Sequence, residues 1–185
     1  MFSLMSHKAR VDLFNRFVKE QNLNIADEKI KILEDMSYFD APASTKFHLS
    51  YEGGLFEHSV NVAIILNNIT KDCSLSWQRD CSPYIIGLFH DICKCDLYLK
   101  QPNGTYSYNV DADQRHGLKS VELLKKLIYI TDEEAACIEH HMGAFTDKDK
   151  WKGYTDAIHK FENVLWTHTA DMFASQVFEE KYGNT

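Results

Sequence analysis

Histidine and aspartate recur in this chain inside stretches that are otherwise apolar. His58 lies in one such stretch, His90 and Asp91 end another, and Asp171 stands on the apolar stripe of the last one. Imidazole and carboxylate groups are ligands that divalent transition metals accept. An ionised carboxylate in apolar surroundings is costly unless a cation or hydrogen-bond donors meet it. These residue types therefore indicate a metal site, whose chemistry would be the activation of water and the binding of phosphate.

A purely structural interpretation competes with the metal at each of these positions. For Asp91 the alternative is a buried salt bridge to Lys94 or Arg115. Taken singly, a His or Asp on an apolar face is more often a satisfied polar group of the core than a ligand. A lone His-Asp dipeptide is a weak signal, so the positions have to be judged together.

The elements that must hold these residues are helices. Apolar residues recur at spacings of three and four, which is typical of amphipathic helices. Asp27 can cap one helix, Ser82 is the expected N-cap of another with Pro83 at its first position, and Thr131 with Glu134 forms a capping box. Helices are expected over about 5–21, 27–36, 56–69, 82–91, 114–129, 131–142 and 161–175.

One segment departs from the helical spacing of apolar residues and has the pattern of short β-strands. Residues 97–99 and 105–108 flank Pro102-Asn103-Gly104, which predicts a small β-hairpin near residues 96–108. A polar loop is expected between Met142 and the last helix. The predicted fold class is all-α, a helical bundle with this one hairpin. Residues 1–185 are expected to form a single domain, with a motif-bearing core over about 43–175 and N-terminal helices over 5–39.

Composition excludes several classes of protein. The 185 residues carry 20 Lys and Arg against 27 Asp and Glu, a formal charge of −7, which argues against a broad nucleic-acid-binding surface. The longest apolar run, 62–66, is far shorter than a membrane helix, and the first residues have no apolar signal core. Five cysteines without a CxxC spacing indicate free thiols. We expect a cytoplasmic protein without a membrane partner, and nothing here sets its oligomeric state.

The order His58, then His90-Asp91, then Asp171 resembles the HD-domain superfamily of metal-dependent phosphohydrolases. This family pattern is His, His-Asp and Asp on separate helices of an all-α fold. Cys93 stands where the family often has glycine after the His-Asp pair. The segments that carry the resemblance are 53–59, 88–94 and 170–172.

Two further segments, 116–120 and 139–143, are similar to a subgroup with extra histidines. It includes the HD domain of bacterial 3′-to-5′ exoribonucleases, the HD-GYP cyclic dinucleotide phosphodiesterases and the YqeK-type dinucleoside polyphosphate hydrolases. The resemblance implies one or two divalent ions, with Asp91 bridging them. His141 is favoured over His140 because it aligns with the single histidine of the YqeK-type segment, but both stay open. The implied ligands are His58, His90, Asp91, His116, His140, His141 and Asp171.

The same resemblance implies roles beside the ions. Asp91 would orient a metal-activated hydroxide, and Lys94 would stabilise charge on the phosphate. The alternative for Lys94 is a solvated lysine at a helix end. His48, which recurs in the exoribonuclease-like relatives, is a candidate for binding substrate phosphate, and the alternative is a structural role. Lys119 and Trp151 are the other candidates for substrate binding. Trp151 can stack on a base, although a solvated loop explains it equally well.

Three hairpin tyrosines, Tyr98, Tyr106 and Tyr108, either wall the same cleft or pack across the strands, and packing is favoured. The ions can be Mn, Fe, Ni, Co, Zn or Mg, because this ligand set does not select one. The sequence predicts a metal-dependent phosphohydrolase or phosphodiesterase for a nucleotide, a dinucleotide or a nucleic-acid end. The alternative is a nucleotide-binding regulatory module that retains the metal cage with little or no turnover.

Overall fold

The computed structural model describes residues 5–182. Within them the fold is helical apart from one two-stranded antiparallel hairpin, which confirms the all-α prediction. The α-helices are α1 (His7–Glu20), α2 (Asp27–Asp35), α3 (Gly54–Asp72), α4 (Ser82–Phe89), α5 (His116–Leu127), α6 (Asp132–Glu139), α7 (Trp151–Lys160), α8 (Asn163–Phe173) and α9 (Glu179–Tyr182). The shorter elements are the 3₁₀ turns η2 (Ile92–Asp96), η3 (Gly143–Phe145) and η4 (Lys148–Lys150), the π turn η5 (Ala174–Phe178), and the strands β1 (Tyr98–Lys100) and β2 (Tyr106–Tyr108).

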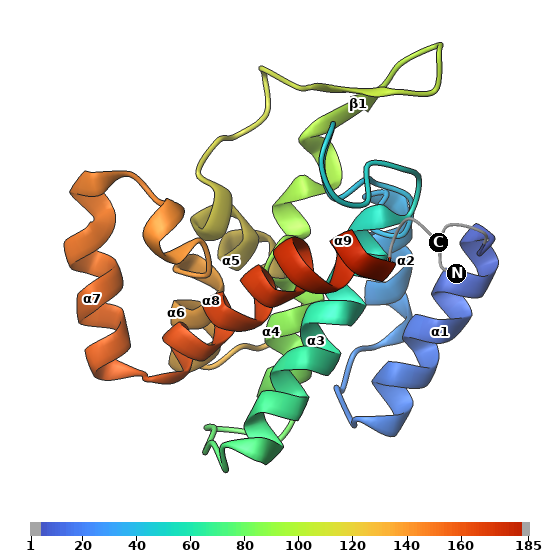
Figure 1. The fold of residues 1–185 in the computed structure, drawn as a ribbon. Coiled ribbons are helices and arrows are strands. Elements are labelled where there is room, and N and C mark those ends of the chain that lie inside the picture. The colour runs from blue at the N-terminus through green and yellow to red at the C-terminus, as the bar shows by residue number, and fades with distance from the viewer. Residues whose placement is uncertain (1–4, 183–185) are drawn as a thin grey trace.

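Helices α3 and α4 form the centre of the molecule. The α8–η5–α9 segment crosses α3 in Figure 1, while α1 and α2 lie on one flank and α7 at the opposite edge. A Cβ at Gly87 would lie 2.3 Å from Ala63 Cα, so only glycine permits the close approach of α4 to α3. This approach places the start of α3 beside the end of α4.

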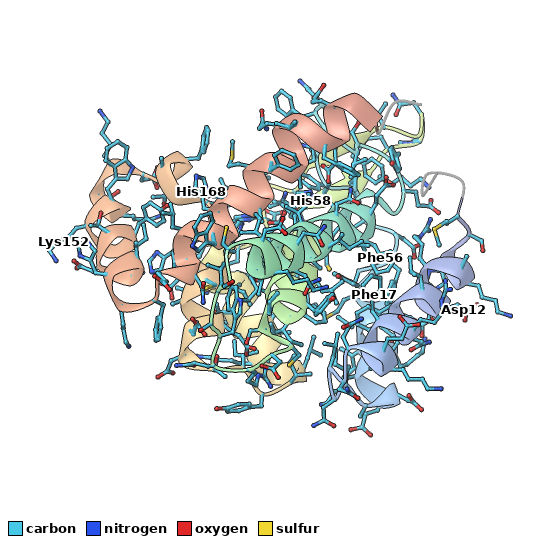
Figure 2. All side chains as sticks on the ribbon, turned by 60° about the horizontal axis from the view of Figure 1, so that its bottom comes forward. Asp12, Phe17, Phe56, His58, Lys152 and His168 are labelled. Atoms are coloured by element: carbon cyan, nitrogen blue, oxygen red, sulfur yellow. The ribbon has the colours of Figure 1, made fainter. Side chains whose placement is uncertain are left out.

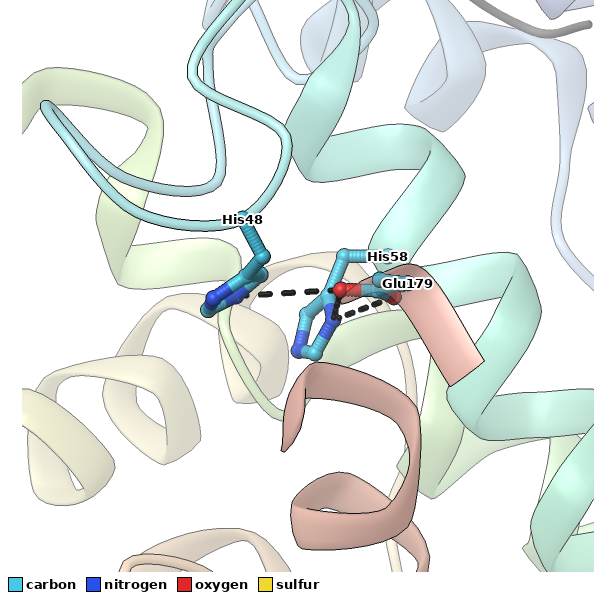
Figure 3. Close-up of side chains that lie close together, drawn as sticks. All are labelled: His48, His58 and Glu179. Atoms are coloured by element: carbon cyan, nitrogen blue, oxygen red, sulfur yellow. Dashed lines mark hydrogen bonds and ion pairs between the residues drawn. The ribbon is translucent and has the colours of Figure 1, made fainter. Parts of the chain in front are cut away.

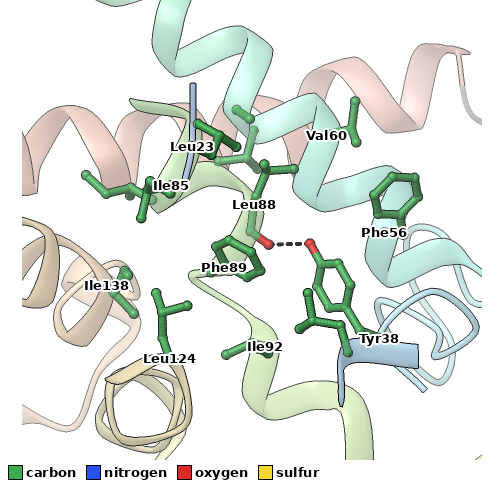
Figure 4. Close-up of a cluster of buried hydrophobic side chains, with 14 of the residues drawn as sticks. Leu23, Tyr38, Phe56, Val60, Ile85, Leu88, Phe89, Ile92, Leu124 and Ile138 are labelled. Carbon is green, nitrogen blue, oxygen red and sulfur yellow. Dashed lines mark hydrogen bonds between the residues drawn. The ribbon is translucent and has the colours of Figure 1, made fainter. Parts of the chain in front are cut away.

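Aromatic side chains hold the N-terminal helices against this centre. Phe14 of α1 is fully buried, and its ring centroid lies 5.4 Å from that of Phe39 and 6.0 Å from that of Phe89, both in edge-to-face geometry. Tyr38 belongs to the same cluster, and its hydroxyl donates a hydrogen bond of 2.5 Å to the carbonyl of Leu88 (Figure 4). The cluster fixes the C-terminal end of α4, which His90 and Asp91 follow directly.

Two predicted helix starts differ from the structure. The N-cap of α4 is Cys81, because the buried hydroxyl of Ser82 donates to Glu134 instead of capping the helix. Asp27 is the first residue of α2, after Ala26 as N-cap, and its side chain makes no cap hydrogen bond. The predicted helix over 82–91 is also shorter, since α4 ends at Phe89 and the His-Asp pair follows it.

The capping box and the hairpin are confirmed. Thr131 accepts from the amide of Glu134, and the Glu134 carboxylate accepts from the amide of Thr131. In the hairpin, Tyr98 pairs with Tyr108. Both signals are local, because each is set by residues within a few positions of one another.

The polar loop predicted after Met142 is wrong in part, because residues 151–160 form α7. No residue of α7 is fully buried, and no side chain caps its N-terminus. Tyr154, Ala157 and Ile158 pack against the core from one side of the helix. Tyr154, Ala157 and Ile158 recur at helical spacing, so periodicity favours this helix, while the missing cap and Gly153 in its first turn weaken the local signal for its start.

The cysteines and the hydropathy agree with the predictions. All five cysteines are free, and Cys93 and Cys137 are buried. Over residues 5–182, every helix falls short of the length or the hydropathy needed to cross a bilayer.

Candidate metal centre

Side chains from five helical segments converge beneath α8. His58 comes from the first turns of α3, where Figure 2 shows it in the middle of the molecule. Its Nε2 lies 3.3 Å from Nε2 of His90, which follows α4, and 3.1 Å from Oδ1 of Asp171 on α8. His58 and His90 are buried, and Asp171 is half-buried. These three residues form one side of the centre.

A second pair of histidines forms the other side. His116, the first residue of α5, and His141, which follows α6, have Nε2 atoms 3.1 Å apart. A Cβ at Gly117 would lie 2.1 Å from the carbonyl oxygen of Glu139, so only glycine lets α5 begin against the end of α6. Glycine at this position therefore brings His116 beside His141.

Asp91 lies between the two histidine pairs. Its Oδ2 is 3.6 Å from His58 Nε2 and 3.4 Å from His90 Nε2. Its Oδ1 is 2.9 Å from His116 Nε2 and 3.4 Å from His141 Nε2. One carboxylate oxygen thus faces each pair, which is the arrangement that a carboxylate shared between two cations needs.

Each of the four imidazoles has a partner at Nδ1, the ring nitrogen that faces away from the centre. A proton on Nδ1 leaves a lone pair on Nε2, which then points inward as a metal-binding atom. His90 and His141 donate from Nδ1 to backbone carbonyls, and His58 donates to a carboxylate. The contacts are His58 with Glu179 at 2.9 Å, His90 with Gly87 at 2.9 Å, His141 with Ile138 at 2.7 Å and His116 with Cys93 Sγ at 3.0 Å.

The residues fit a divalent metal. Asp91 Oδ1 is buried and accepts no hydrogen bond from the residues described, although two ring nitrogens lie within 3.4 Å. Imidazole lone pairs and this oxygen face the same space, and a cation satisfies all of them where no N–H or O–H group does. Among the described residues, four triplets have ligand atoms close enough to hold an ion. Asp91 belongs to two of them, one with His58 and His90 and the other with His116 and His141. The other two are His90, His141 and Asp171, and His48, His58 and Glu179.

Electrostatics keep the centre charged in the absence of metal. Burial by itself would raise the pKa of Asp91, but Lys94, His90 and His116 outweigh it and hold that pKa well below its usual value. Burial would likewise lower the pKa of His58, yet Glu179 and Asp171 outweigh it and raise the pKa to about 10. A proton on His58 thus takes the place of a cation in the metal-free protein.

Lys94 reaches the centre from η2, one turn after Asp91. Its Nζ donates a hydrogen bond of 2.7 Å to Asp91 Oδ2, and the negative charge of Asp91 raises the pKa of Lys94 against the effect of burial. The salt bridge considered for Asp91 therefore forms with Lys94. It does not form with Arg115, which binds Asp113 and Glu122.

A cavity of about 230 Å³, here called the metal-side cavity, opens onto these groups. His58, Asp91, His141 and Asp171 line it with Lys94, and so do His48, Met142 and Phe145. A small anionic ligand can therefore reach the ligand atoms from solvent.

The family model for the HD domain matches residues 55–166, more than half of the chain. The chain belongs to the HD-domain family of metal-dependent phosphohydrolases. Over 79 residues this HD domain is 35% identical to a dihydroneopterin 2′,3′-cyclic phosphate phosphodiesterase of Methanocaldococcus jannaschii. That similarity covers 40% of this chain and 30% of the relative. No solved structure matches the HD domain.

Four further residues were predicted for this HD domain, and only His48 lies at the centre. Its Nε2 is buried, lies 3.9 Å from Glu179 Oε2 and forms no hydrogen bond within the described chain (Figure 3). Burial and the neighbouring His58 lower the pKa of His48 to about 4. A neutral imidazole on the wall of the metal-side cavity can donate one hydrogen bond to a ligand.

The other three predicted residues lie elsewhere. His140 is half-buried, belongs to none of the ligand triplets and faces Gly153 of α7, so the structure places His141 rather than His140 at the centre. Lys119 is buried and its Nζ lies 2.5 Å from Asp96 Oδ1, so its charge is already paired. Trp151 is exposed at the start of α7, where its indole N–H donates to Thr146.

Glu179 is a buried contact of the centre that the sequence analysis missed. Its carboxylate accepts hydrogen bonds from His58 Nδ1 and, at 3.0 Å, from Asn61 Nδ2 (Figure 3). Eight residues after Asp171, a regular helix would rotate Glu179 by about 80° from the face of Asp171. The π turn η5 accommodates an extra residue and brings the side chain back to that face. The sequence shows only Glu179-Glu180, without a signal for the π turn.

Proposed function

We propose that this HD domain is a metal-dependent phosphohydrolase whose substrate is a phosphate ester of the nucleotide type. The observation that carries the proposal is the position of Asp91, with one carboxylate oxygen facing His58 and His90 and the other facing His116 and His141. A core that only needed to bury polar groups would pair Asp91 Oδ1 with a donor, and it has none within the described chain.

The ligands would be His58, His90, Asp91 and Asp171 on one side, with His116 and His141 on the other. When bound, one or two divalent ions supply a nucleophilic hydroxide at neutral pH and neutralise phosphate charge. Imidazole and carboxylate ligands accept several first-row divalent ions, so the ion that binds would be set by which of these metals is available.

The remaining groups bind and orient the phosphate. Lys94 holds Asp91 Oδ2 at 2.7 Å and also lines the metal-side cavity, so its other N–H groups can donate to phosphate oxygens. His48 faces the same cavity from the loop before α3 and can donate a further hydrogen bond. Both groups bind an anion whose charge grows in the transition state, which is how they would accelerate hydrolysis.

The relative from Methanocaldococcus jannaschii supports a phosphodiester as substrate, because its name describes cleavage of a cyclic phosphate on an organic ring compound. Among the predicted substrates, a nucleic-acid end and a dinucleotide joined through one phosphate carry a phosphodiester, whereas a simple mononucleotide carries a phosphomonoester. This chain spans only 30% of the length of that relative, so its substrate is proposed from the chemistry of the site.

Turnover of bis-p-nitrophenyl phosphate with Mn²⁺ tests the proposal. Wild-type protein should release p-nitrophenol, and Asp91→Ala should lose this activity by about three orders of magnitude, which is typical for removal of a catalytic group. Asp96→Ala is the matched control, because Asp96 is exposed and pairs with Lys119 away from the centre. Equal slow release by wild type and Asp91→Ala would show that the protein is no such enzyme, and retained Mn²⁺ binding would then favour the regulatory module.

A further inference from the structure

Two more cavities meet the centre at His116. The hairpin cavity, of about 300 Å³, extends toward the strands β1 and β2, and the α7 cavity, of about 550 Å³, extends toward α7. In Figure 1 the hairpin and α7 stand on different sides of the bundle. Gln114, His116 and Met142 line both cavities, so these three residues mark where they join. Both volumes fall in the range of roughly 300–1,000 Å³ that is usual for small-molecule sites.

Aromatic side chains form the wall of the hairpin cavity. Tyr98 and Tyr108 pair across the strands with ring centroids 6.1 Å apart, and both line the cavity with Leu97. The two tyrosines therefore combine the cleft wall and the cross-strand packing that the sequence left as alternatives. Lys94 lines this cavity as well as the metal-side cavity, so a phosphate beside Lys94 has an aromatic wall next to it.

The wall of the α7 cavity includes apolar side chains that the fold leaves accessible, beside several polar and charged ones. Phe145 is 67% exposed and Leu118 is 37% exposed, and Tyr154 faces the cavity from α7. Large apolar side chains gathered beside a cavity are typical of ligand sites. Phe145 and Met142 also line the metal-side cavity, so the two cavities adjoin at these side chains.

The charges around the α7 cavity are already paired. Arg115 binds Asp113 and Glu122 at 2.6 and 2.9 Å, and Lys150 lies 3.1 Å from Asp147. No unpaired Lys or Arg is left among the described residues that line this cavity. A second phosphate placed there would lack a counter-ion, whereas an uncharged ring would bury apolar surface.

Given the proposed function, we infer that the substrate is a diester of a single phosphate with an uncharged organic group on each side. One group occupies the hairpin cavity, the other occupies the α7 cavity, and the phosphate lies between them near His116 and Lys94. Hydrolysis consumes one water molecule, whose oxygen forms a new bond to phosphorus. The bond between phosphorus and one of the two ester oxygens breaks, and the organic group on that oxygen leaves as an alcohol with one proton of the water. The other organic group stays on the phosphate as a phosphomonoester. Polyphosphates and nucleic-acid strands fit less well, because their additional phosphates would meet no free cation.

Gly153 offers a way to fill the α7 cavity alone. It lines the cavity from α7, and a Cβ there would lie 3.7 Å from His140 Cε1, an ordinary contact. Gly153→Phe would place a ring where the substrate group is expected. Lys152→Phe is the matched control, because Lys152 is 85% exposed and points outward in Figure 2.

The experiment measures the hydrolysis of two diesters by the Mn²⁺-loaded protein. Bis-p-nitrophenyl phosphate carries two rings, and methyl p-nitrophenyl phosphate carries one. Gly153→Phe should lower kcat/KM for the two-ring diester by about tenfold, the smallest effect expected when a buried ring loses its site. The one-ring diester should change by less than about twofold, because its ring fits the hairpin cavity. Lys152→Phe should change neither, and equal effects of Gly153→Phe on both diesters, or no effect on either, would overturn the inference.

Binding separates this inference from the proposed function. If the wild type cleaves no ester, the proposed function fails, and diphenyl phosphate then serves as a ligand with Mg²⁺ in place of paramagnetic Mn²⁺. Changes in the backbone amide chemical shifts of both Tyr108 and Gly153 on ligand binding would support two occupied cavities. Loss of the change at position 153 in the Gly153→Phe protein would place the second ring in the α7 cavity. Shifts at one end alone, or at neither, would refute the two-cavity substrate.

Discussion

A proton on His58 competes with the metal for the same nitrogen. In the metal-free protein Glu179 and Asp171 raise the pKa of His58 to about 10, against the effect of burial, so its imidazole is protonated at neutral pH. The ordinary pKa of a histidine is 6.5, so the contribution of these ion pairs to folding is fully present below pH 6.5 and is lost as the pH rises through 10. Metal binding at Nε2 requires the neutral ring, so the bound ion takes over the role of the proton.

We therefore predict that Mn²⁺ affinity rises with pH. Between pH 6 and 8 the dissociation constant should fall about tenfold per pH unit for each proton displaced, and His58 supplies at least one. The carboxyls of Asp91 and Asp171 add nothing to this slope, because their pKa values are held below the usual range. Equilibrium dialysis at several pH values measures the slope. His7→Gln is the control, because His7 pairs with Asp40 and Glu34 away from the centre, and a pH-independent affinity would contradict the prediction.

Glu179 positions His58 and should control the affinity of the first metal. Its buried carboxylate accepts from His58 Nδ1 at 2.9 Å and fixes the ring with Nε2 inward. Glu179→Gln should weaken Mn²⁺ or Co²⁺ binding by about 10- to 100-fold and shift the Co²⁺ absorption spectrum, as loss of a ligand's outer partner usually does. Glu180→Gln, at the exposed neighbouring position, should change neither. Unaltered affinity and spectrum in Glu179→Gln would exclude the positioning role.

The contrast between His58 and Glu179 shows what sequence can predict at single residues. His58, His90, Asp91 and Asp171 were found because each stands in an apolar helical stretch and because their order resembles a family pattern. Glu179 was missed because its place on the inner face depends on the π turn, and helical periodicity assigns it to another face. The ion pair of Lys119 with Asp96 was not predicted for a similar reason, since Asp96 comes from a different element.

At the scale of elements, two glycine contacts bring the histidine pairs together. Gly87 lets α4 approach α3, and Gly117 lets α5 begin against the last turn of α6. These contacts place His90 beside His58 and His116 beside His141 without strain in the helices. Since both are contacts between elements, no local pattern in the sequence announces them.

Gly117→Ala should therefore disturb one side of the centre selectively. A Cβ 2.1 Å from the carbonyl oxygen of Glu139 forces α5 away from α6, at a cost of about 1–3 kcal/mol in folding stability, and moves His116 from His141. Mn²⁺ bound per protein should fall, while sites on the His58 side remain. Gly153→Ala is the control, because its nearest contact is 3.7 Å away. Metal analysis after dialysis gives the answer, and an unchanged ratio in Gly117→Ala would refute this account.

Element prediction succeeded where the signal was local. The capping box of Thr131 and Glu134 and the turn at Pro102-Asn103-Gly104 each act within a few residues, and both are present in the structure. Helix α7 was missed although Tyr154, Ala157 and Ile158 recur at helical spacing, because no side chain caps its start and Gly153 lies in its first turn. The start of α4 was misjudged because the Ser82 hydroxyl binds Glu134, a contact 52 residues away in the chain.

At the scale of the whole molecule, the formal charge of −7 and the proposed anionic substrate are compatible only if positive charge is added locally. Each divalent ion adds +2 at the point where the histidines and Asp91 meet. Glu57, Glu133, Glu134 and Glu179 are buried, whereas the carboxylates that lie in water are screened by salt within about 10 Å. The acidic balance thus disfavours a long nucleic-acid strand, while a single phosphate at the centre remains favourable.

Metal binding should also stabilise the entire fold. The proposed ligands come from α3, the segment after α4, α5, the segment after α6, and α8, so an unfolded chain cannot present them together. At a Mn²⁺ concentration 100 times the dissociation constant, the free energy of unfolding should rise by about 2.7 kcal/mol. For a chain of this size that corresponds to roughly 5–11 °C in Tm.

Thermal denaturation with and without Mn²⁺ measures this linkage. Asp91→Ala should show little or no shift in Tm, because Asp91 is shared by the triplet with His58 and His90 and the triplet with His116 and His141, which are the ones proposed to hold the ions. Asp147→Ala, which removes a 77% exposed carboxylate distant from those triplets, should retain the full shift. A chelator should return the wild type to the metal-free Tm. If Asp91→Ala gains as much stability from Mn²⁺ as the wild type, the ion binds elsewhere, and the histidines around Asp91 are polar groups of the core.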